Sequence, residues 1–255
     1  MAAALTVDEY LQIIKRAGDT LLADALAAGM DAKVPTCRTW TASHLVAHQA
    51  VVHRWAIAVV TEGGEQRTHT QTQVRALPDL VGFYREGLDL LLAALAAAPT
   101  DLDVMTFLAD VTSSRIFWAR RQAHELTMHG VDALSARLGR VPTTAECAID
   151  ANVAADGLDE LLRGFYTRGK SKIFDGMEYT FVVAPTDMPT SWVVHVGEQM
   201  SVAPPGTTAP TSVRMRLSGT AAGLYLALWN RGTDVVAEGD LDVLARWHRE
   251  QRIRW

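Results

Sequence analysis

A change of hydrophobic period divides this 255-residue sequence into two parts. Across residues 6–166 the apolar residues recur at spacings of three and four, and alanine and leucine dominate. This period is typical of amphipathic α-helices, because residues three and four apart share one helix face. After about residue 168, alternating segments rich in β-branched residues indicate strands. We therefore expect a mainly helical first part and a mixed second part.

The first part contains the signals of four or five helices. Thr6 and Glu9 have the spacing of a capping box, and Gly29 can end the helix that they begin. Further helices are expected over residues 41–60, 80–97, 113–138 and 144–166. Modest loops between helices of this length predict an antiparallel bundle, and we assign residues 1–168 to it.

The second part is expected to be a small α+β domain over residues 169–255. A short basic segment at 168–172 marks the boundary. Strands are predicted at 179–183, 191–196 and 212–217, separated by turns rich in proline and glycine. Short helices are predicted at 223–229 and 241–247, the second with Asp240 as its N-cap.

Composition excludes several classes of protein. The 24 basic and 29 acidic residues give a net charge of −5, so no basic surface is expected for nucleic acid. The two cysteines exclude a disulfide scaffold and a four-cysteine zinc site, and they suit the cytoplasm. The N-terminus has no signal-peptide pattern, and the longest apolar run, at 90–98, is far shorter than the ~20 residues of a membrane span. We expect a cytoplasmic protein without membrane partners, either a monomer or a small homo-oligomer.

Histidines cluster in two of the predicted helices. One segment, HLVAHQAVVHRW, carries His44, His48 and His53; the other, RRQAHELTMHG, carries His124, Glu125 and His129. Glu125 and His129 are four residues apart, so they share one helix face. His124 and His129 are five apart and differ by about 140° around the helix, which excludes the H-E-x-x-H metalloprotease motif.

A metal site with an open catalytic position uses three protein ligands, so Glu125 and His129 need a third. His44 and His48 also share a face, and either can complete the site if the two helices pack together. Such mixed nitrogen and oxygen ligands suit zinc, nickel, iron(II) or manganese. The alternative is a set of surface or hydrogen-bonded histidines with no metal, in which Glu125 and His129 form a weak helical pair.

Three parts of the sequence resemble the mycothiol-dependent maleylpyruvate isomerase family, which is related to DinB-like metal-binding bundles. They are VPTCRTWTASHLVAHQAVVHRWA, FWARRQAHELTMHGVDAL, and LWNRG with VAEGDLDVLARW, and the resemblance covers nearly the whole chain. It implies a DinB-like four-helix bundle that binds a divalent metal, usually zinc, followed by a C-terminal domain similar to sterol carrier proteins. The family pattern W-T-x-x-x-L-x-x-H places one ligand at His48, and E-x-x-x-H places the others at Glu125 and His129.

The resemblance also assigns roles to residues outside this triad. Family enzymes place an arginine of the small domain near the substrate, and Arg231 matches it best, so Arg231 is the catalytic candidate. His44 has no ligand role in the family pattern, and His53 is expected to line the bundle or a pocket wall. Cys37 has a counterpart in many relatives, but Arg38 and Thr39 follow it here where relatives often have proline and glycine.

The implied chemistry is that of a thiol activated by a metal. A cation lowers the pKa of a thiol that enters its open position. The resemblance implies that this thiol is mycothiol, a cosubstrate, and that it attacks a small-molecule electrophile in a cis–trans isomerisation or a thiol S-transfer. Arg115, Arg120 and Arg121 are candidate donors to the hydroxyl-rich cosubstrate. The alternatives are a metal- or small-ligand-binding module without catalysis, and a structural bundle with incidental histidines.

Overall fold

The computed structural model describes residues 5–64, 69–108 and 111–251, and the chain forms two compact units. The first unit contains Leu5–Phe107 and Val111–Pro142. The second contains residues 143–251 together with Leu108. None of the described helices combines the length and the apolarity that crossing a membrane requires.

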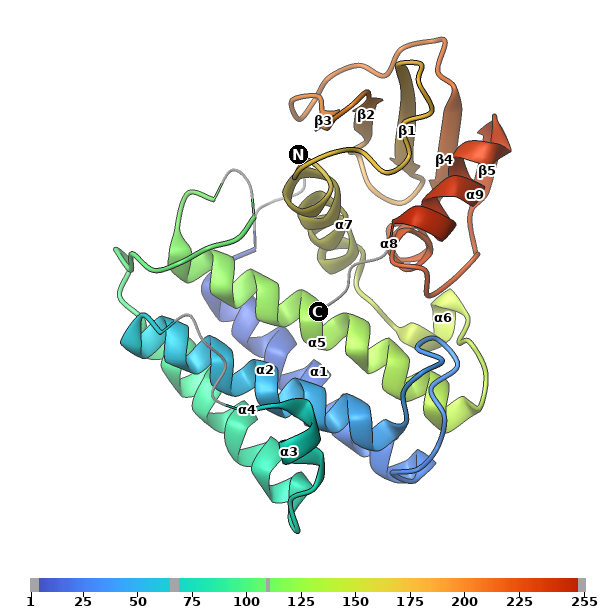
Figure 1. Ribbon diagram of the computed structural model, residues 1–255. Coiled ribbons are helices and arrows are strands. Elements are labelled where there is room, and N and C mark those ends of the chain that lie inside the picture. The colour runs from blue at the N-terminus through green and yellow to red at the C-terminus, as the bar shows by residue number, and fades with distance from the viewer. Residues whose placement is uncertain (1–4, 65–68, 109–110, 252–255) are drawn as a thin grey trace. The chain divides into compact units, whose positions relative to one another are not determined.

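The first unit is a four-helix bundle (Figure 1). It consists of α1 (Val7–Ala28), α2 (Ala42–Glu62), α4 (Leu80–Ala97) and α5 (Ser114–Leu138), with a short helix α3 (Gln71–Arg75) between α2 and α4. Helix α1 packs mainly on α5, α2 packs mainly on α4, and α2 also contacts α5. The helix ends follow local signals: Thr6 and Glu9 form the capping box of α1, and Ser113 caps α5.

Helices α2 and α5 are the most enclosed elements of the bundle. Long apolar side chains such as Leu45 and Trp118 are completely buried. The same helices also bury polar side chains, which is unusual for charged residues unless they are paired. These are His48, Gln49 and His53 on α2 and Arg121, Gln122, His124, Glu125, His129, Asp132 and Ser135 on α5. The bundle interior therefore contains the polar groups from which a site can be built.

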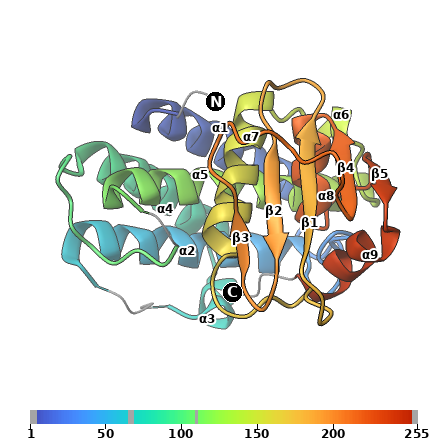
Figure 2. The same ribbon diagram turned by 90° about the horizontal axis from the view of Figure 1, so that it is seen from above.

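The second unit contains a five-stranded sheet. The strands are β1 (Tyr179–Pro185), β2 (Trp192–Val196), β3 (Met200–Val202), β4 (Met215–Gly219) and β5 (Val236–Gly239). Their order is β3-β2-β1-β4-β5, with β1 and β4 parallel and the other neighbours antiparallel (Figure 2). The buried helix α8 (Ala221–Leu228) contacts β1 and β4, and α9 (Leu241–Glu250), capped by Asp240, contacts β5. The expected architecture, a helical bundle followed by a small α+β part, is confirmed.

The structure differs from the sequence prediction at residues 144–166. The expected single helix is divided into α6 (Thr144–Cys147), α7 (Ala151–Asp159) and a π-helical segment, η1 (Glu160–Phe165). Ala148 adopts a positive φ of 49°, and Asp150 then caps α7, so the helical path is interrupted between them. Helix α7 packs on α8 rather than in the bundle. Helical periodicity indicates that one face of a helix is apolar, but it does not indicate which other element packs against that face.

Along the sequence, the first compact unit ends at Pro142 and the second continues from Thr143, which is earlier than the predicted boundary at residue 168. Compactness does not by itself define a part that folds alone, so the domain boundary between residues 168 and 169 stays a prediction. Helix α3 and the short strands β3 and β5 were not predicted, because elements of three to five residues are too short to show a period.

Candidate metal site

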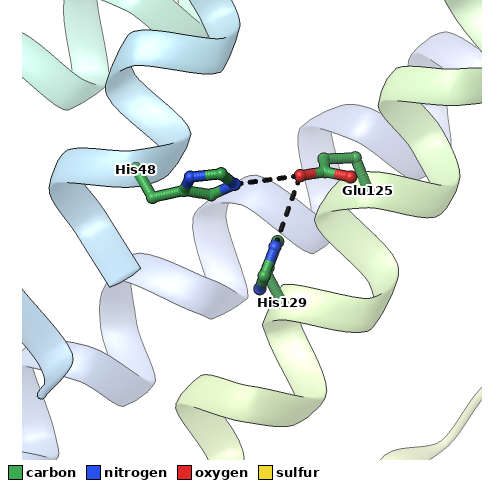
Figure 3. Close-up of side chains that lie close together, drawn as sticks. All are labelled: His48, Glu125 and His129. Atoms are coloured by element: carbon green, nitrogen blue, oxygen red, sulfur yellow. Dashed lines mark hydrogen bonds and ion pairs between the residues drawn. The ribbon is translucent and has the colours of Figure 1, made fainter. Parts of the chain in front are cut away.

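Helices α2 and α5 bring His48, Glu125 and His129 together (Figure 3). Glu125 and His129 are one turn apart on α5, and His48 faces them from α2. One ligand atom of each residue lies within 4.8 Å of those of the other two. All three side chains are buried, with relative exposures of 3 to 4%.

One oxygen of Glu125 is the meeting point of the cluster. His48 Nε2 lies 3.1 Å from Glu125 Oε1, and His129 Nε2 lies 3.3 Å from the same oxygen. Two imidazole nitrogens and a carboxylate oxygen form a donor set that suits zinc and other first-row divalent metals. Because these three donors converge in a buried place, the residues present fit a divalent cation.

The electrostatics of the cluster favour positive charge. Burial by itself would raise the pKa of Glu125, but hydrogen bonds from His129 and His48 and the nearby Arg121 hold that pKa well below its usual range. Burial by itself would lower the pKa of His129, but hydrogen bonds to Asp132 and Glu125 raise it to about 9. The cluster therefore attracts positive charge, either as a proton on His129 or as a bound cation.

A series of hydrogen bonds fixes His129 on the Nδ1 side of its ring. His129 Nδ1 donates to Asp132 Oδ2 at 2.9 Å, and Thr36 Oγ1 donates to Asp132 Oδ1 at 2.6 Å. The Ser135 hydroxyl lies 2.9 Å from that of Thr36. A carboxylate at Nδ1 leaves Nε2 directed at Glu125, and such partners fix the orientation of a metal-binding histidine.

Trp40 packs over both imidazole rings. Its ring stacks on that of His129 at 5.7 Å between centroids and 17° between planes, and it lies 4.9 Å from that of His48. Trp40 precedes Thr41, the N-cap residue of α2. The segment that begins α2 therefore also restricts the rings of the two histidines.

Sequence reasoning missed Thr36, Trp40, Gln49 and Asp132 as parts of this site. Asp132 lies three residues after His129, which is a same-face spacing that could have revealed it. Gln49 Nε2 donates to Glu125 Oε1 at 3.3 Å across the bundle. Contacts of this kind have no sequence spacing of their own, because they depend on how α2 and α5 pack.

The other histidines of the two helices lie elsewhere. His44 is the third residue of α2, and its Nδ1 accepts a hydrogen bond from the backbone nitrogen of Thr41. His124 is fully buried beside Tyr10, away from the triad as its helical angle predicts. His53 is fully buried with its ring 5.1 Å from that of Tyr84, so it lines the bundle interior as expected.

The candidate arginines occupy different environments. Arg121 is 2% exposed and its side chain lies 3.2 Å from Glu125 Oε2, so it is part of the buried cluster. Arg115 donates to the backbone oxygen of Ala96, and Arg120 is half-buried. Arg231 follows α8 in the second unit and donates to the backbone oxygen of Trp229 at 2.8 Å. Its catalytic role stays a prediction, and Cys37 is half-buried and forms no disulfide.

Comparisons with known proteins give consistent results. The family model described as the mycothiol maleylpyruvate isomerase N-terminal domain matches residues 11–134, and the model of the corresponding C-terminal domain matches residues 152–246. The fold is similar to the crystal structures of the mycothiol-dependent maleylpyruvate isomerase and of a mutant with one histidine replaced by alanine. Each is 18% identical, with a TM-score of 0.63, and the similarity covers 93% of this chain and 95% of the other. Among curated proteins, none matches this chain in sequence.

Proposed function

This chain belongs to the mycothiol-dependent maleylpyruvate isomerase family, and from that premise we propose that it is an enzyme that uses a divalent metal and mycothiol. His48, Glu125 and His129 hold the metal, which we propose to be zinc. The substrate is an electrophilic small molecule, and the reaction is a cis–trans isomerisation or a thiol S-transfer. We propose that the enzyme acts in the cytoplasm, and the absence of a disulfide between its two cysteines is consistent with this.

The observation that carries this proposal is the convergence of three buried donor atoms on one place in the bundle. Three protein ligands leave at least one position open for an incoming group. A divalent cation held there lowers the pKa of a thiol, so that the thiol is a nucleophile at neutral pH. A nucleophile supplied by a cosubstrate also agrees with the raised pKa of Cys147, about 11, which burial causes.

The residues of this chain position and shield the reacting groups. Asp132 keeps Nε2 of His129 directed at Glu125 Oε1, because it occupies Nδ1. Trp40 covers both imidazoles and excludes water from their faces. We propose that Arg231 contacts the substrate, because it matches the substrate arginine of the family.

Metal analysis of the purified protein tests the site. We expect about one metal ion per chain in the wild type and a loss of most of it in His48→Ala and in Glu125→Gln, since each removes one of three ligands. His44→Gln is the matched control: it lies on the same helix, and glutamine can retain the capping interaction with Thr41. Unchanged metal content in both ligand variants would contradict the site.

Turnover decides between an enzyme and a binding module. We expect mycothiol to bind to the metal-loaded protein, as calorimetry can measure, and to be required for conversion of a cis-alkene or another electrophile. Binding of mycothiol without turnover of any electrophile would instead favour the module that lacks catalysis.

A further inference from the structure

The two carboxylate oxygens of Glu125 have different partners. Oε1 lies near His48 Nε2 and His129 Nε2, and it also accepts a hydrogen bond from Gln49 Nε2 at 3.3 Å. Oε2 accepts a hydrogen bond from the guanidinium of Arg121 at 3.2 Å. In Figure 3 both histidine contacts end on the same oxygen, and the other oxygen points away from them. The two carboxylate oxygens of Glu125 therefore have different hydrogen-bonding environments.

Arg121 is buried together with Glu125. Their side chains are 2% and 3% exposed, and they are four residues apart on α5. An arginine in a protein interior loses its hydration, which a close carboxylate must compensate. A guanidinium has no lone pair to offer a metal. Any effect of Arg121 on a cation at this site must therefore act through Glu125 and through its own charge.

The contact of Arg121 with Oε2 bears on how many donor atoms the protein can offer to a cation. A carboxylate can bind a cation through one oxygen or through both. With Oε2 engaged by Arg121, Glu125 offers only Oε1, and the two imidazoles bring the donor atoms to three. If Glu125 offered both oxygens, the protein would supply four donor atoms, and an external thiol would have to displace one of them or bind as a fifth.

We propose that Arg121 is a positioning residue that restricts Glu125 to one-oxygen binding and so keeps a position open for a thiol. This inference rests on the metal site of the proposed function. It assigns Arg121 to the support of the site rather than to contact with mycothiol. The charge of the cluster matters as well: Arg121 balances one of the two buried carboxylates, Glu125 and Asp132.

The experiment uses Co²⁺ as the metal and 2-mercaptoethanol as the thiol, without oxygen. The full-length chain is stripped of metal and titrated with Co²⁺, and the thiol is then added while the sulfur-to-cobalt absorption band is recorded. The variants are Arg121→Met, which removes the guanidinium, and Arg121→Lys, which keeps the charge but not the planar fork. Arg137→Met, at a more exposed arginine of α5 that pairs with Asp24, is the matched control.

We expect the wild type and Arg137→Met to bind Co²⁺ and to develop the sulfur band at the same thiol concentration. We expect Arg121→Met to retain Co²⁺, with a weaker visible absorption because its coordination number is higher. Its sulfur band should require at least about tenfold more thiol, comparable to the 10- to 100-fold effects of residues that support metal ligands. Arg121→Lys should lie between the two.

The outcomes separate this inference from the proposed function. If the wild type binds no Co²⁺, the metal site fails, and the inference fails with it. If Arg121→Met binds Co²⁺ and thiol as the wild type does, only the inference is overturned. If the wild type binds Co²⁺ but neither Arg121 variant does, Arg121 is needed to form the site rather than to keep a position open, and the inference is again wrong.

Discussion

His53 shows how the position of a single residue sets its charge. The side chain is completely buried on α2, and neither ring nitrogen has a hydrogen-bond partner among the described residues. Burial, followed by the positive charges of Arg54 and His48, lowers the pKa of His53 from 6.5 to about 3. The imidazole is therefore neutral in the folded protein at neutral pH, while in the unfolded chain it takes up a proton below pH 6.5.

This difference predicts an acid sensitivity. Because the folded-state pKa is the lower one, the unfolded state binds more protons between pH 6.5 and about 3, so stability falls as the pH falls through this window. His53 can contribute a slope of up to about 1.4 kcal/mol per pH unit. In His53→Leu this contribution is absent, and denaturant unfolding of the two proteins between pH 7 and pH 4 should show the smaller slope for the variant. Equal slopes would mean that His53 is protonated in the fold or is not buried.

At the scale of elements, close contact between helices depends on small residues at particular places. Gly18 lies on the buried face of α1, and the hydroxyl of Tyr84 on α4 donates to its backbone oxygen at 2.9 Å. A Cβ at Gly18 would lie 2.7 Å from Cδ2 of Leu88, which is itself only 3% exposed. By contrast, a Cβ at Gly130 of α5 would have no described atom within 4 Å.

We therefore predict opposite effects of two glycine-to-alanine changes in the same bundle. Gly18→Ala should lower the free energy of unfolding by about 1–3 kcal/mol, because the added methyl group overpacks the contact between α1 and α4. Gly130→Ala should raise it by roughly 0.5–1 kcal/mol, because alanine loses less backbone entropy in a helix. Denaturant unfolding followed by circular dichroism measures both. A stabilising effect at Gly18 would show that α1 and α4 are not this close.

The bounds of several helices could be predicted from local sequence signals. The helix over residues 80–97 has the predicted bounds, and Gly29 and Asp240 mark helix ends as expected. Caps and periods act within a few residues, so they are visible in the sequence. The division of residues 144–166 and the two short strands were not predictable, because packing against α8 and pairing with longer strands decide them.

At the scale of the whole molecule, the candidate groups belong to different units. His48, Glu125 and His129 lie in the bundle, whereas Arg231 lies in the unit that contains the sheet. Burial raises the pKa of Tyr166, which lies close enough to Arg231 for the arginine charge to oppose that rise. If Arg231 acts on the substrate, as we propose, a residue of the second unit takes part in the reaction.

The corresponding prediction separates catalysis from metal binding. Arg231→Ala should leave the metal content unchanged and lower the mycothiol-dependent turnover of an electrophile that the wild type converts by about 100-fold, the order of effect of removing one group that stabilises a transition state. Arg249→Ala, in an exposed arginine of the same unit, should change neither quantity. Equal turnover in the two variants would show that Arg231 has no catalytic role.

The sequence by itself determined the helical bundle, the change to an α+β part, and the same-face pair of Glu125 and His129. These follow from spacing along one element, which fixes the side of a helix on which each side chain lies. Spacing alone did not determine that His48 rather than His44 meets this pair, which the family resemblance implied. The sequence did not show that Trp40 and Asp132 hold the histidines, or that Arg121 engages only one oxygen of Glu125. Only the packing of α2 on α5 decided these contacts, because the energy of a buried polar group depends on the partners that other elements bring to it.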